Sequence, residues 1–224
     1  MCGRYSLTTP AEALENLFGV GPLDNFLPRY NIAPSQTAPV VRVDEGGERH
    51  WAPLRWGLIP SWAKDPSIGN RMINARAETA AEKPSFRAAL RRRRCLVPAD
   101  GFYEWKKVGG QSQPTRIELA SSGPMAFAGL WEHWRGDGGQ TIETFTILTT
   151  EANRDLAAIH HRMPVILAPE HYEVWLKIGA GDVDLLRPMM GPYEAERLIA
   201  RPVSRHVNNP RNDDPGCLEP AGLL

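Results

Sequence analysis

The chain carries a cysteine directly after its initiator methionine, in the segment MCGRY. Cells usually remove the methionine ahead of a small second residue, and removal would leave Cys2 with both a thiol and a free α-amine. A free α-amine titrates near pKa ~7.7–8.0 and a cysteine thiol near ~8.5, so both groups are partly nucleophilic at neutral pH. A cysteine at a frayed chain end is most often inert. Cys2 therefore becomes a candidate nucleophile only if other residues support it.

Three further segments contain polar side chains that a β-rich core would not need. MINARAET alternates polar residues with alanine, so an extended chain places Asn74 and Arg76 on one face. In ADGFYEWKK, Glu104 lies between two aromatic residues, and desolvation there would raise its pKa toward the range useful for proton transfer. In AAIHHRMP, an extended chain points the rings of His160 and His161 to opposite faces, so only one can serve a given site. Taken singly, a surface glutamate and a structural histidine are the commoner explanations.

Other catalytic and metal-binding signatures are missing from the sequence. It contains no G-x-S-x-G, no H-E-x-x-H, no phosphate-binding glycine loop with lysine, and no histidine pair at helical spacing. The three cysteines, Cys2, Cys95 and Cys217, are odd in number and widely separated, so they form neither a disulfide framework nor a C-x-x-C pair. The sequence therefore predicts no metal site and no cofactor.

Two tryptophans in the segment RWGLIPSWAKD have different settings. Trp56 falls in a predicted strand, where core packing is the usual role of the ring. Trp62 follows a Pro-Ser pair and has basic neighbours, and an exposed ring in that setting can stack on an unpaired base. For Trp62, core packing and base stacking are about equally supported.

Composition limits the function classes. The chain has 224 residues, 42% hydrophobic and 23% charged, which is ordinary for a globular domain. No run approaches the ~18 apolar residues of a spanning helix, and the N-terminus lacks a signal-peptide layout, so we expect a cytoplasmic protein without membrane partners. The formal net charge is zero, so any binding to nucleic acid must come from a local patch. Nothing indicates an obligate oligomer, and we expect a monomer.

The polar segments are connected by elements that the local pattern predicts. Residues 9–12 read as a capping box with proline at the first helical position, which predicts a helix ending near Gly19. Further helices are predicted at residues 84–93, 152–159 and 169–177, and a loop with turns is predicted at residues 22–39. Eight segments have strand patterns: residues 38–43, 48–56, 95–99, 101–108, 115–119, 125–134, 141–150 and 163–167.

These elements predict an α+β fold with one domain over residues 1–224. Many short strands separated by glycine turns favour a β-rich, antiparallel and partly barrel-like core with a few peripheral helices. The first two strands flank residues 45–47 and read as a hairpin. The tail, residues 208–224, is rich in turn formers and is predicted to be an irregular surface segment.

The motifs MCGRY, RYNIAPSQ, WGLIPSW, INARAET, CLVPADGFYEW, LTTEAN, IHHRMPVIL and RPVS occur in this order along nearly the whole chain. Together they resemble the SOS-response-associated peptidase (SRAP) family. The resemblance implies a protein that shields abasic sites in single-stranded DNA by attaching to them covalently. It implies that Cys2 is the nucleophile, and that Asn74, Glu104 and His160 form the polar site around it. The positions that match DNA-contacting residues are Arg4, Asn31, Pro34, Trp62, Arg76 and Thr149.

The implied chemistry needs an amine and a thiol on adjacent carbons. The α-amine attacks the ring-opened aldehyde to form a Schiff base, and the thiol closes on the same carbon to form a thiazolidine. We expect His160 to assist ring opening and Schiff-base formation, and Glu104 to move protons at the thiazolidine and during its reversal. We expect Asn74 to hold the α-amine or the sugar oxygen. Arg4, Arg76 and Arg162 are the candidates for the flanking phosphates.

Two departures from the family pattern, and two other functions, remain open. Some relatives have two consecutive aromatics where this chain has Trp62-Ala63, and an acidic residue is common at the position of His161, to which no role is assigned. Cys2 could instead act as an N-terminal nucleophile peptidase, with its own amine as base. The chain could also be a non-catalytic module that binds single-stranded DNA. The sequence leaves open whether lyase or autoproteolytic activity accompanies crosslinking, and which replication or repair proteins are partners.

Overall fold

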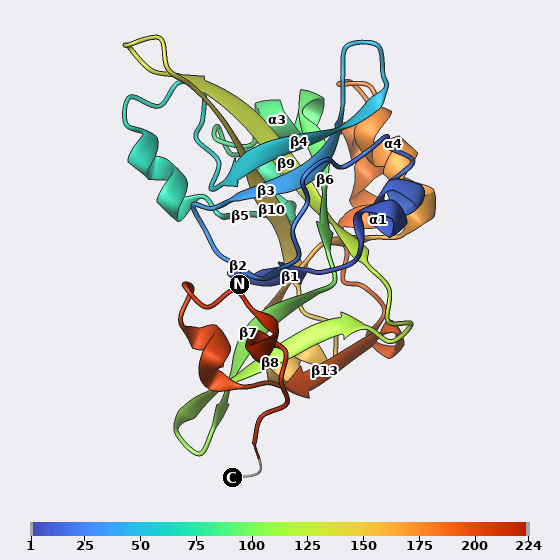
Figure 1. Cartoon of the computed structure of the whole chain (residues 1–224). Helices are drawn as coiled ribbons and strands as arrows, with labels where there is room; N and C mark the ends of the chain where they lie inside the picture. Colours follow the sequence, from blue (N-terminus) through green and yellow to red (C-terminus); the bar gives the residue numbers. More distant parts are fainter. Residues whose placement is uncertain (1, 223–224) are drawn as a thin grey trace.

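Two β-sheets form the framework of this computed structural model, which describes residues 2–222 (Figure 1). Five strands of the larger sheet close into a barrel, because β10 pairs with both β4 and β9. Three short strands extend this sheet. The barrel strands are β3 (Thr37–Val43), β4 (Arg49–Trp56), β6 (Arg94–Ala99), β9 (Met125–Arg135) and β10 (Thr141–Glu151). The additional strands are β5 (Asn74–Arg76), β11 (Arg162–Pro164) and β12 (Ile166–Leu167).

The second sheet is antiparallel and lies below the barrel in Figure 1. β1 lies inside this sheet, paired with β2 on one side and with β7 on the other. The N-terminal segment therefore runs close to the junction of the two sheets. In sheet order the strands are β13 (Leu198–Pro202), β8 (Gln111–Leu119), β7 (Gly101–Val108), β1 (Tyr5–Leu7) and β2 (Arg29–Ile32).

Short helices lie on the outside of the barrel and beside the second sheet. The α-helices are α1 (Ala11–Phe18), α2 (Ala77–Ala80), α3 (Arg87–Arg92) and α4 (Tyr172–Lys177). The 3₁₀ helices are η1 (Pro66–Arg71), η2 (Leu156–Ala158), η3 (Pro169–His171), η4 (Val183–Met190), η5 (Ala195–Arg197), η6 (Arg205–Asn208) and η7 (Pro215–Cys217). Within residues 2–222, no helix has the length and apolar character needed to cross a membrane.

The α+β class with a β-rich, partly barrel-like core is confirmed, and all eight predicted strand segments are strands. Residues 163–167 divide between β11 and β12. The sheet is mixed rather than wholly antiparallel, because β10 pairs in parallel with β4 and β5. Parallel neighbours need long connections, and those pairings leave no local signal of the kind a hairpin turn provides.

Three local predictions are wrong. Residues 22–39 are not a continuous loop, because Arg29–Ile32 form β2 against β1. Residues 152–159 form only the short helix η2, because the Asn153 side chain caps a turn by accepting a hydrogen bond from the Leu156 backbone. The predicted capping box does not form. Helix α1 has Pro10 at its N-cap with no side-chain cap, although its end at Gly19, in the left-handed conformation, is as predicted.

Thr9, which was expected to cap α1, forms its hydrogen bonds with Asp100 instead. The Asp100 carboxylate accepts hydrogen bonds from the hydroxyl of Thr8 at 2.7 Å, from the hydroxyl of Thr9 at 2.6 Å and from the backbone N–H of Thr9 at 3.1 Å. Hydrogen bonds to a charged acceptor are stronger than neutral ones. These contacts fix the end of β1, and with it the register that carries the N-terminal residues past β7.

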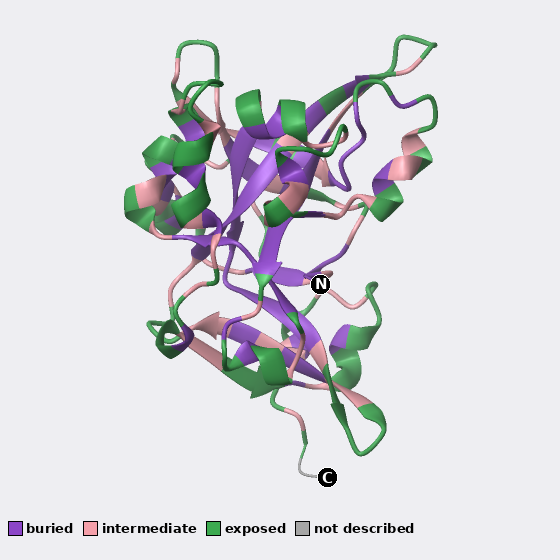
Figure 2. Ribbon diagram, turned by 180° about the vertical axis from the view of Figure 1, so that it is seen from behind, coloured by how far each residue is buried: buried purple, intermediate pink, exposed green. Residues whose placement is uncertain are grey.

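The core fills the barrel and continues to the junction with the second sheet (Figure 2). Trp56 is fully buried, as predicted, and its ring lies 5.3 Å from the ring of Tyr5 in an edge-to-face arrangement. Tyr5 also meets the barrel residue Phe127 edge to face at 6.0 Å. The strand that leads into Cys2 is therefore anchored by aromatic contacts.

The C-terminal tail is more ordered than the sequence indicates. Within residues 208–222, η7 and a bridge between Val203 and Pro220 fix the path of the chain, and Cys217 is fully buried. The carboxylate of Asp213 accepts hydrogen bonds from the backbone N–H groups of Tyr30 and Asn31 in β2. The tail is therefore not a free surface segment but part of the wall around the N-terminal strand.

Candidate functional site

The N-terminal residues lie beside β7. The backbone N–H of Tyr103 donates to the carbonyl of Arg4 at 2.9 Å, which extends the pairing of β1 and β7 beyond Tyr5. This path brings Cys2 toward the strand that carries Glu104. The barrel contributes Asn74 from the start of β5, and the segment before β11 contributes His160.

Asn74 holds the backbone of Cys2. Its side-chain nitrogen donates to the Cys2 carbonyl at 2.8 Å, and its strand is fixed by parallel pairing with β10. The Asn74 side-chain oxygen is buried and has no hydrogen-bond partner among the described residues. An acceptor in this state is costly to leave unsatisfied, and it can receive a hydrogen bond from an added N–H or O–H group near Cys2.

The Cys2 thiol is fully buried. Burial, with a further contribution from the charge of Glu104, raises the pKa of the thiol far above its ordinary value. The thiol is therefore protonated at neutral pH. Attack by Cys2 sulfur then requires a neighbouring base to remove the thiol proton. Glu104 is the candidate, because its carboxylate is the acidic group whose charge contributes to the shift of the Cys2 pKa.

Burial also raises the pKa of Glu104, as the sequence predicts, but the cause differs from the prediction. Glu104 shares a narrow pocket with the apolar residues Phe102, Ile117, Leu156 and Ile159. The adjacent aromatics Tyr103 and Trp105 instead pack in a separate cluster with the C-terminal tail. Neighbouring side chains in a strand point to opposite faces, so residues adjacent in sequence do not desolvate one another.

His160 lines the same pocket as Glu104. The backbone N–H of Arg162 donates to His160 Nδ1 at 3.0 Å, and the Arg162 carbonyl lies 3.2 Å from the same nitrogen. Burial lowers the His160 pKa, and the Arg162 charge acts in the same direction, so the ring is neutral at physiological pH. The predicted separation of the two histidine rings is wrong. The rings of His160 and His161 stack 4.4 Å apart, because the chain turns here instead of being extended.

Glu78 is a part of the site that sequence reasoning did not assign. Its carboxylate, from α2, accepts two hydrogen bonds from the guanidinium of Arg162, at 2.7 and 2.9 Å. Arg162 also donates to the backbone carbonyl of Thr149 at 2.5 Å. Because the Arg162 backbone holds the ring of His160, Glu78 acts on the orientation of that histidine through Arg162. Its place in the alternating segment MINARAET was the only signal in the sequence.

Three of the residues expected at DNA are occupied within the protein. Asn31 is fully buried, and its side-chain nitrogen donates to carbonyls of residues 207, 209 and 212 in the tail. Thr149 is also fully buried beside β5. Arg162 is 7% exposed and bound to Glu78. These positions support their neighbours, and a contact of their side chains with DNA stays a prediction.

The remaining expected DNA contacts are more accessible. Arg76 is exposed at the end of β5, and Pro34 lies half-buried in the turn between β2 and β3. Arg4 is half-buried, with one guanidinium nitrogen bonded to the Asn31 side-chain oxygen at 2.7 Å and to the Val207 carbonyl at 2.9 Å. A cavity of 450 Å³ is lined by Arg76, His161 and Arg162. This cavity adjoins the narrow pocket, since Arg162 lines both.

The loop between β4 and η1 presents a single large ring to solvent. Trp62 is 59% exposed, which favours stacking over core packing. Ala63 is buried in a small cluster with Ile59 and Trp134, and its carbonyl accepts a hydrogen bond from the Trp134 indole at 2.6 Å. The position next to Trp62 therefore faces inward in this chain, so no second ring is presented there.

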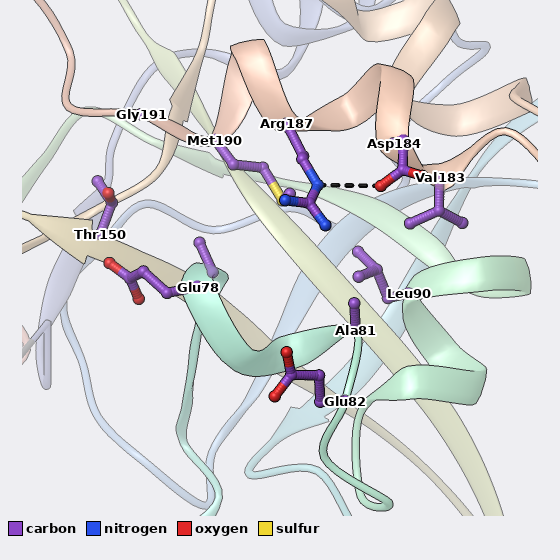
Figure 3. A pocket seen from close by; sticks show the side chains of 11 residues that line it. Glu78, Ala81, Glu82, Leu90, Thr150, Val183, Asp184, Arg187, Met190 and Gly191 are labelled. Carbon is purple, nitrogen blue, oxygen red and sulfur yellow. Dashed lines mark hydrogen bonds and ion pairs between the residues drawn. The ribbon is translucent and has the colours of Figure 1, made fainter.

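A separate cavity of 290 Å³ lies between α2 and η4 (Figure 3). Glu78 forms part of its wall, and an ion pair between Arg187 and Asp184 at 2.9 Å lies beside it. None of Cys2, Asn74, Glu104 and His160 lines this cavity. Glu104 and His160 line the narrow pocket instead, and Cys2 is linked to this region by its hydrogen bond from Asn74 and by the charge of Glu104.

Comparisons with known proteins agree with this arrangement. The profile of the family described as SOS response associated peptidase (SRAP) matches residues 1–210. The chain is 44% identical to abasic site processing protein YoqW of Bacillus subtilis (strain 168), over 98% of this chain and 99% of that protein. It is 34% identical to abasic site processing protein HMCES of Pongo abelii, over 100% of this chain and 77% of that protein.

Solved structures share the fold. A crystal structure of a protein from Bacteroides thetaiotaomicron superposes with a TM-score of 0.86 at 27% identity, over 98% of this chain and all of the other. A crystal structure of a protein from Bordetella bronchiseptica superposes with a TM-score of 0.78 at 31% identity, over 91% of this chain and all of the other. The chain therefore belongs to the SOS response associated peptidase family.

Proposed function

We propose that this protein processes abasic sites in single-stranded DNA by forming a thiazolidine between Cys2 and the ring-opened sugar. The observation that carries the proposal is the setting of Cys2. Its carbonyl is held by Asn74, and its thiol is buried within the field of Glu104. The curated relatives named abasic site processing proteins support the choice of substrate. The reaction requires removal of Met1, which lies outside the described residues.

The proposed reaction releases one water. The α-amine of Cys2 adds to the aldehyde carbon, and loss of water forms the Schiff base. Cys2 sulfur then adds to the same carbon while the thiol proton leaves and the nitrogen gains a proton, which closes the five-membered ring. Only a cysteine with a free α-amine offers an amine and a thiol at this spacing. In the thiazolidine the former aldehyde carbon is bonded to both the nitrogen and the sulfur of Cys2, whereas in a Schiff base it is bonded to the nitrogen alone. The closed ring would therefore resist heat better than a Schiff base.

His160 and Glu104 have environments suited to different proton transfers. The lowered pKa of His160 keeps its ring neutral, so it can assist opening of the sugar and loss of water. The raised pKa of Glu104 lets its carboxyl both accept the thiol proton and return it during reversal. Asn74 fixes the Cys2 backbone, and its side-chain oxygen, which has no hydrogen-bond partner within residues 2–222, is placed to accept from the amine or the sugar.

The proposal is tested with the purified wild-type chain and a single-stranded oligonucleotide that contains one abasic site. We expect an adduct that survives heating on a denaturing gel, with the mass of both components less one water. The intact mass of the protein should correspond to the chain without Met1. An oligonucleotide with a reduced sugar lacks the aldehyde and should give no adduct.

Three outcomes would overturn the proposal. Retention of Met1 would leave the nitrogen of Cys2 in an amide and remove the nucleophile. DNA binding without an adduct would instead support a non-catalytic binding module. Cleavage of peptides by a chain that forms no adduct would support the N-terminal nucleophile peptidase.

Trp62→Ala tests the expected path of the DNA. Because the ring is 59% exposed, its removal should weaken binding without changing the unfolding midpoint. Stacking of one base on an aromatic ring contributes about 1–3 kcal/mol, so affinity for single-stranded DNA should fall about 5- to 150-fold, measured by fluorescence anisotropy. Val108→Ala, at another exposed apolar position, is the matched control. Equal affinities for wild type and Trp62→Ala would place the DNA elsewhere.

A further inference from the structure

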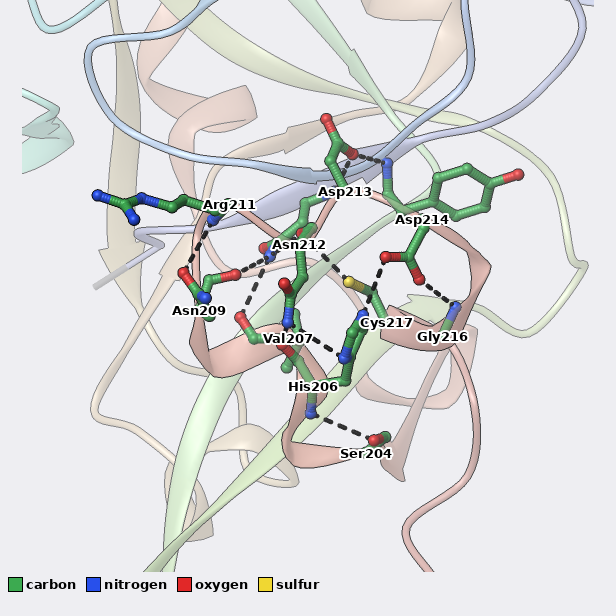
Figure 4. Close-up of polar contacts among 12 residues, drawn as sticks. Ser204, His206, Val207, Asn209, Arg211, Asn212, Asp213, Asp214, Gly216 and Cys217 are labelled. Carbon is green, nitrogen blue, oxygen red and sulfur yellow. Dashed lines mark hydrogen bonds and ion pairs between the residues drawn. The ribbon is translucent and has the colours of Figure 1, made fainter.

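Three side chains of the C-terminal segment converge on one point (Figure 4). The potential ligand atoms of His206, Asp214 and Cys217 all lie within 4.8 Å of one another. His206 Nε2 and the Asp214 carboxylate are 2.9 Å apart. His206 belongs to η6, while Asp214 caps the start of η7 and Cys217 ends it. Two short turns thus assemble a nitrogen, an oxygen and a sulfur.

The contacts do not fit a catalytic triad. A Cys-His-Asp triad places the thiol and the carboxylate at opposite nitrogens of the ring. Here Asp214 contacts Nε2, and the side-chain nitrogen of Asn212 contacts Nδ1 at 3.1 Å. The thiol of Cys217 donates instead to the Asn212 carbonyl at 3.4 Å. No ring nitrogen is left to take a proton from the thiol.

We propose that this cluster binds a zinc ion through His206 Nε2, an Asp214 carboxylate oxygen and Cys217 sulfur, with water as the fourth ligand. Zinc accepts nitrogen, oxygen and sulfur together in tetrahedral sites, whereas magnesium and calcium prefer oxygen alone. Tetrahedral zinc separates such ligand atoms by roughly 3.3–3.8 Å. The observed spacings extend from 2.9 Å up to 4.8 Å, so shifts of about 1 Å or less complete the site. The Cys217 thiol loses its proton to solvent as the sulfur binds the metal.

The surroundings of the cluster suit a metal site. Metal-binding histidines are commonly oriented through the second ring nitrogen, and Asn212 is in that place. Rotation of the Asn212 amide would let its oxygen accept the proton of Nδ1 when Nε2 binds metal, at the expense of the hydrogen bond that its nitrogen donates to the His206 carbonyl at 2.8 Å. Gly216 allows the close approach of the ligands, because a Cβ there would lie 2.9 Å from the Asp214 carboxylate and 3.2 Å from the His206 ring. His206 and Asp214 side chains are 40% and 52% exposed, which leaves them room to adjust.

The sequence predicts no metal site because the usual sequence signatures of metal sites are cysteine or histidine pairs at short spacing. This ligand set mixes three residue types and depends on how the tail folds. A metal here would also stiffen the segment that supports Arg4, since the carbonyl of Val207 in η6 accepts a hydrogen bond from that arginine. The proposed role is therefore structural, at the wall behind the N-terminal strand.

Cobalt titration of the full-length, chelator-treated chain tests the proposal. We expect one cobalt ion per chain, a thiolate-to-cobalt charge-transfer band, and loss of the band when zinc is added in competition. Cys217→Ser should abolish the band. His206→Gln should weaken cobalt binding at least about tenfold, and as a change at an exposed side chain it leaves the fold testable if the buried cysteine variant does not fold.

Cys2→Ala is the essential control, because a free N-terminal cysteine can itself chelate metal. This variant should keep the band, so the outcome is independent of the proposed reaction at Cys2. The inference is overturned if wild type shows no band, if the band survives in Cys217→Ser, or if it disappears in Cys2→Ala. Circular dichroism of each variant verifies that loss of the band is not loss of the fold.

Discussion

Cys2→Ala is expected to abolish the heat-stable adduct with abasic DNA. Alanine at the second position still permits removal of Met1, so the variant retains the α-amine and can form a Schiff base. It lacks the sulfur that closes the ring, and the product therefore reverts on heating. Borohydride reduces a Schiff base to a stable amine, so a gel run with and without this reagent separates the two cases. Wild type should give an adduct without borohydride, and Cys2→Ala only with it.

Cys2→Ser refines the same experiment. Serine retains both nucleophilic positions but closes an oxygen ring that is weaker, so we expect an adduct of intermediate heat stability. Cys95→Ala is the matched control, because Cys95 is a fully buried thiol in β6 and Glu104 is not among the groups that shift its pKa. Each substitution removes one buried sulfur, and we expect a loss of stability of about 1 kcal/mol. A wild-type level of heat-stable adduct from Cys2→Ala would exclude the thiazolidine.

The fold could be predicted where the signal is local. The strands of the barrel are rich in β-branched, aromatic and other apolar residues, and the hairpin of β3 and β4 surrounds a glycine turn at Gly47, which has φ +82°. β1, β2, β5 and β13 were missed, because each has three to five residues and takes its partner from a distant part of the chain. A short strand has too few residues to show alternation, and its stability comes from pairing.

The candidate site was partly accessible from sequence for the same physical reason. Asn74, Glu104 and His160 belong to motifs in which a polar residue interrupts an apolar pattern. Glu78 supports the site through its hydrogen bonds from Arg162, which is 84 residues away in the sequence. Asn31 looked like a surface loop residue because the packing of the tail against β2 has no signature in the local pattern. Long-range contacts thus decide which polar residues face a ligand and which support their neighbours.

Glu104→Gln is expected to slow both formation and reversal of the crosslink. In the wild type, the rates of these two steps should depend on pH in opposite directions. Formation needs the ionised carboxylate, which accepts the thiol proton, so its rate should rise as pH rises through the Glu104 pKa. Reversal needs the protonated carboxyl, which returns a proton to the leaving sulfur, so its rate should fall over the same range. Burial raises the pKa of this group, and both transitions should therefore lie above the ordinary range of a glutamate.

Glutamine has a similar shape but cannot exchange this proton, so the variant should lose both transitions. General acid-base catalysis contributes about 10²–10⁴-fold, which is the expected loss in each rate. Formation is followed on denaturing gels with abasic single-stranded DNA across a pH series. Reversal is followed from purified adduct, with a large excess of a second abasic oligonucleotide to capture the released protein. Glu143→Gln, a carboxylate paired with Arg42 on the barrel, is the control and should retain the wild-type profiles. Unchanged pH profiles in Glu104→Gln would assign the proton transfers to another group, with His160 the first to test because it lines the same pocket.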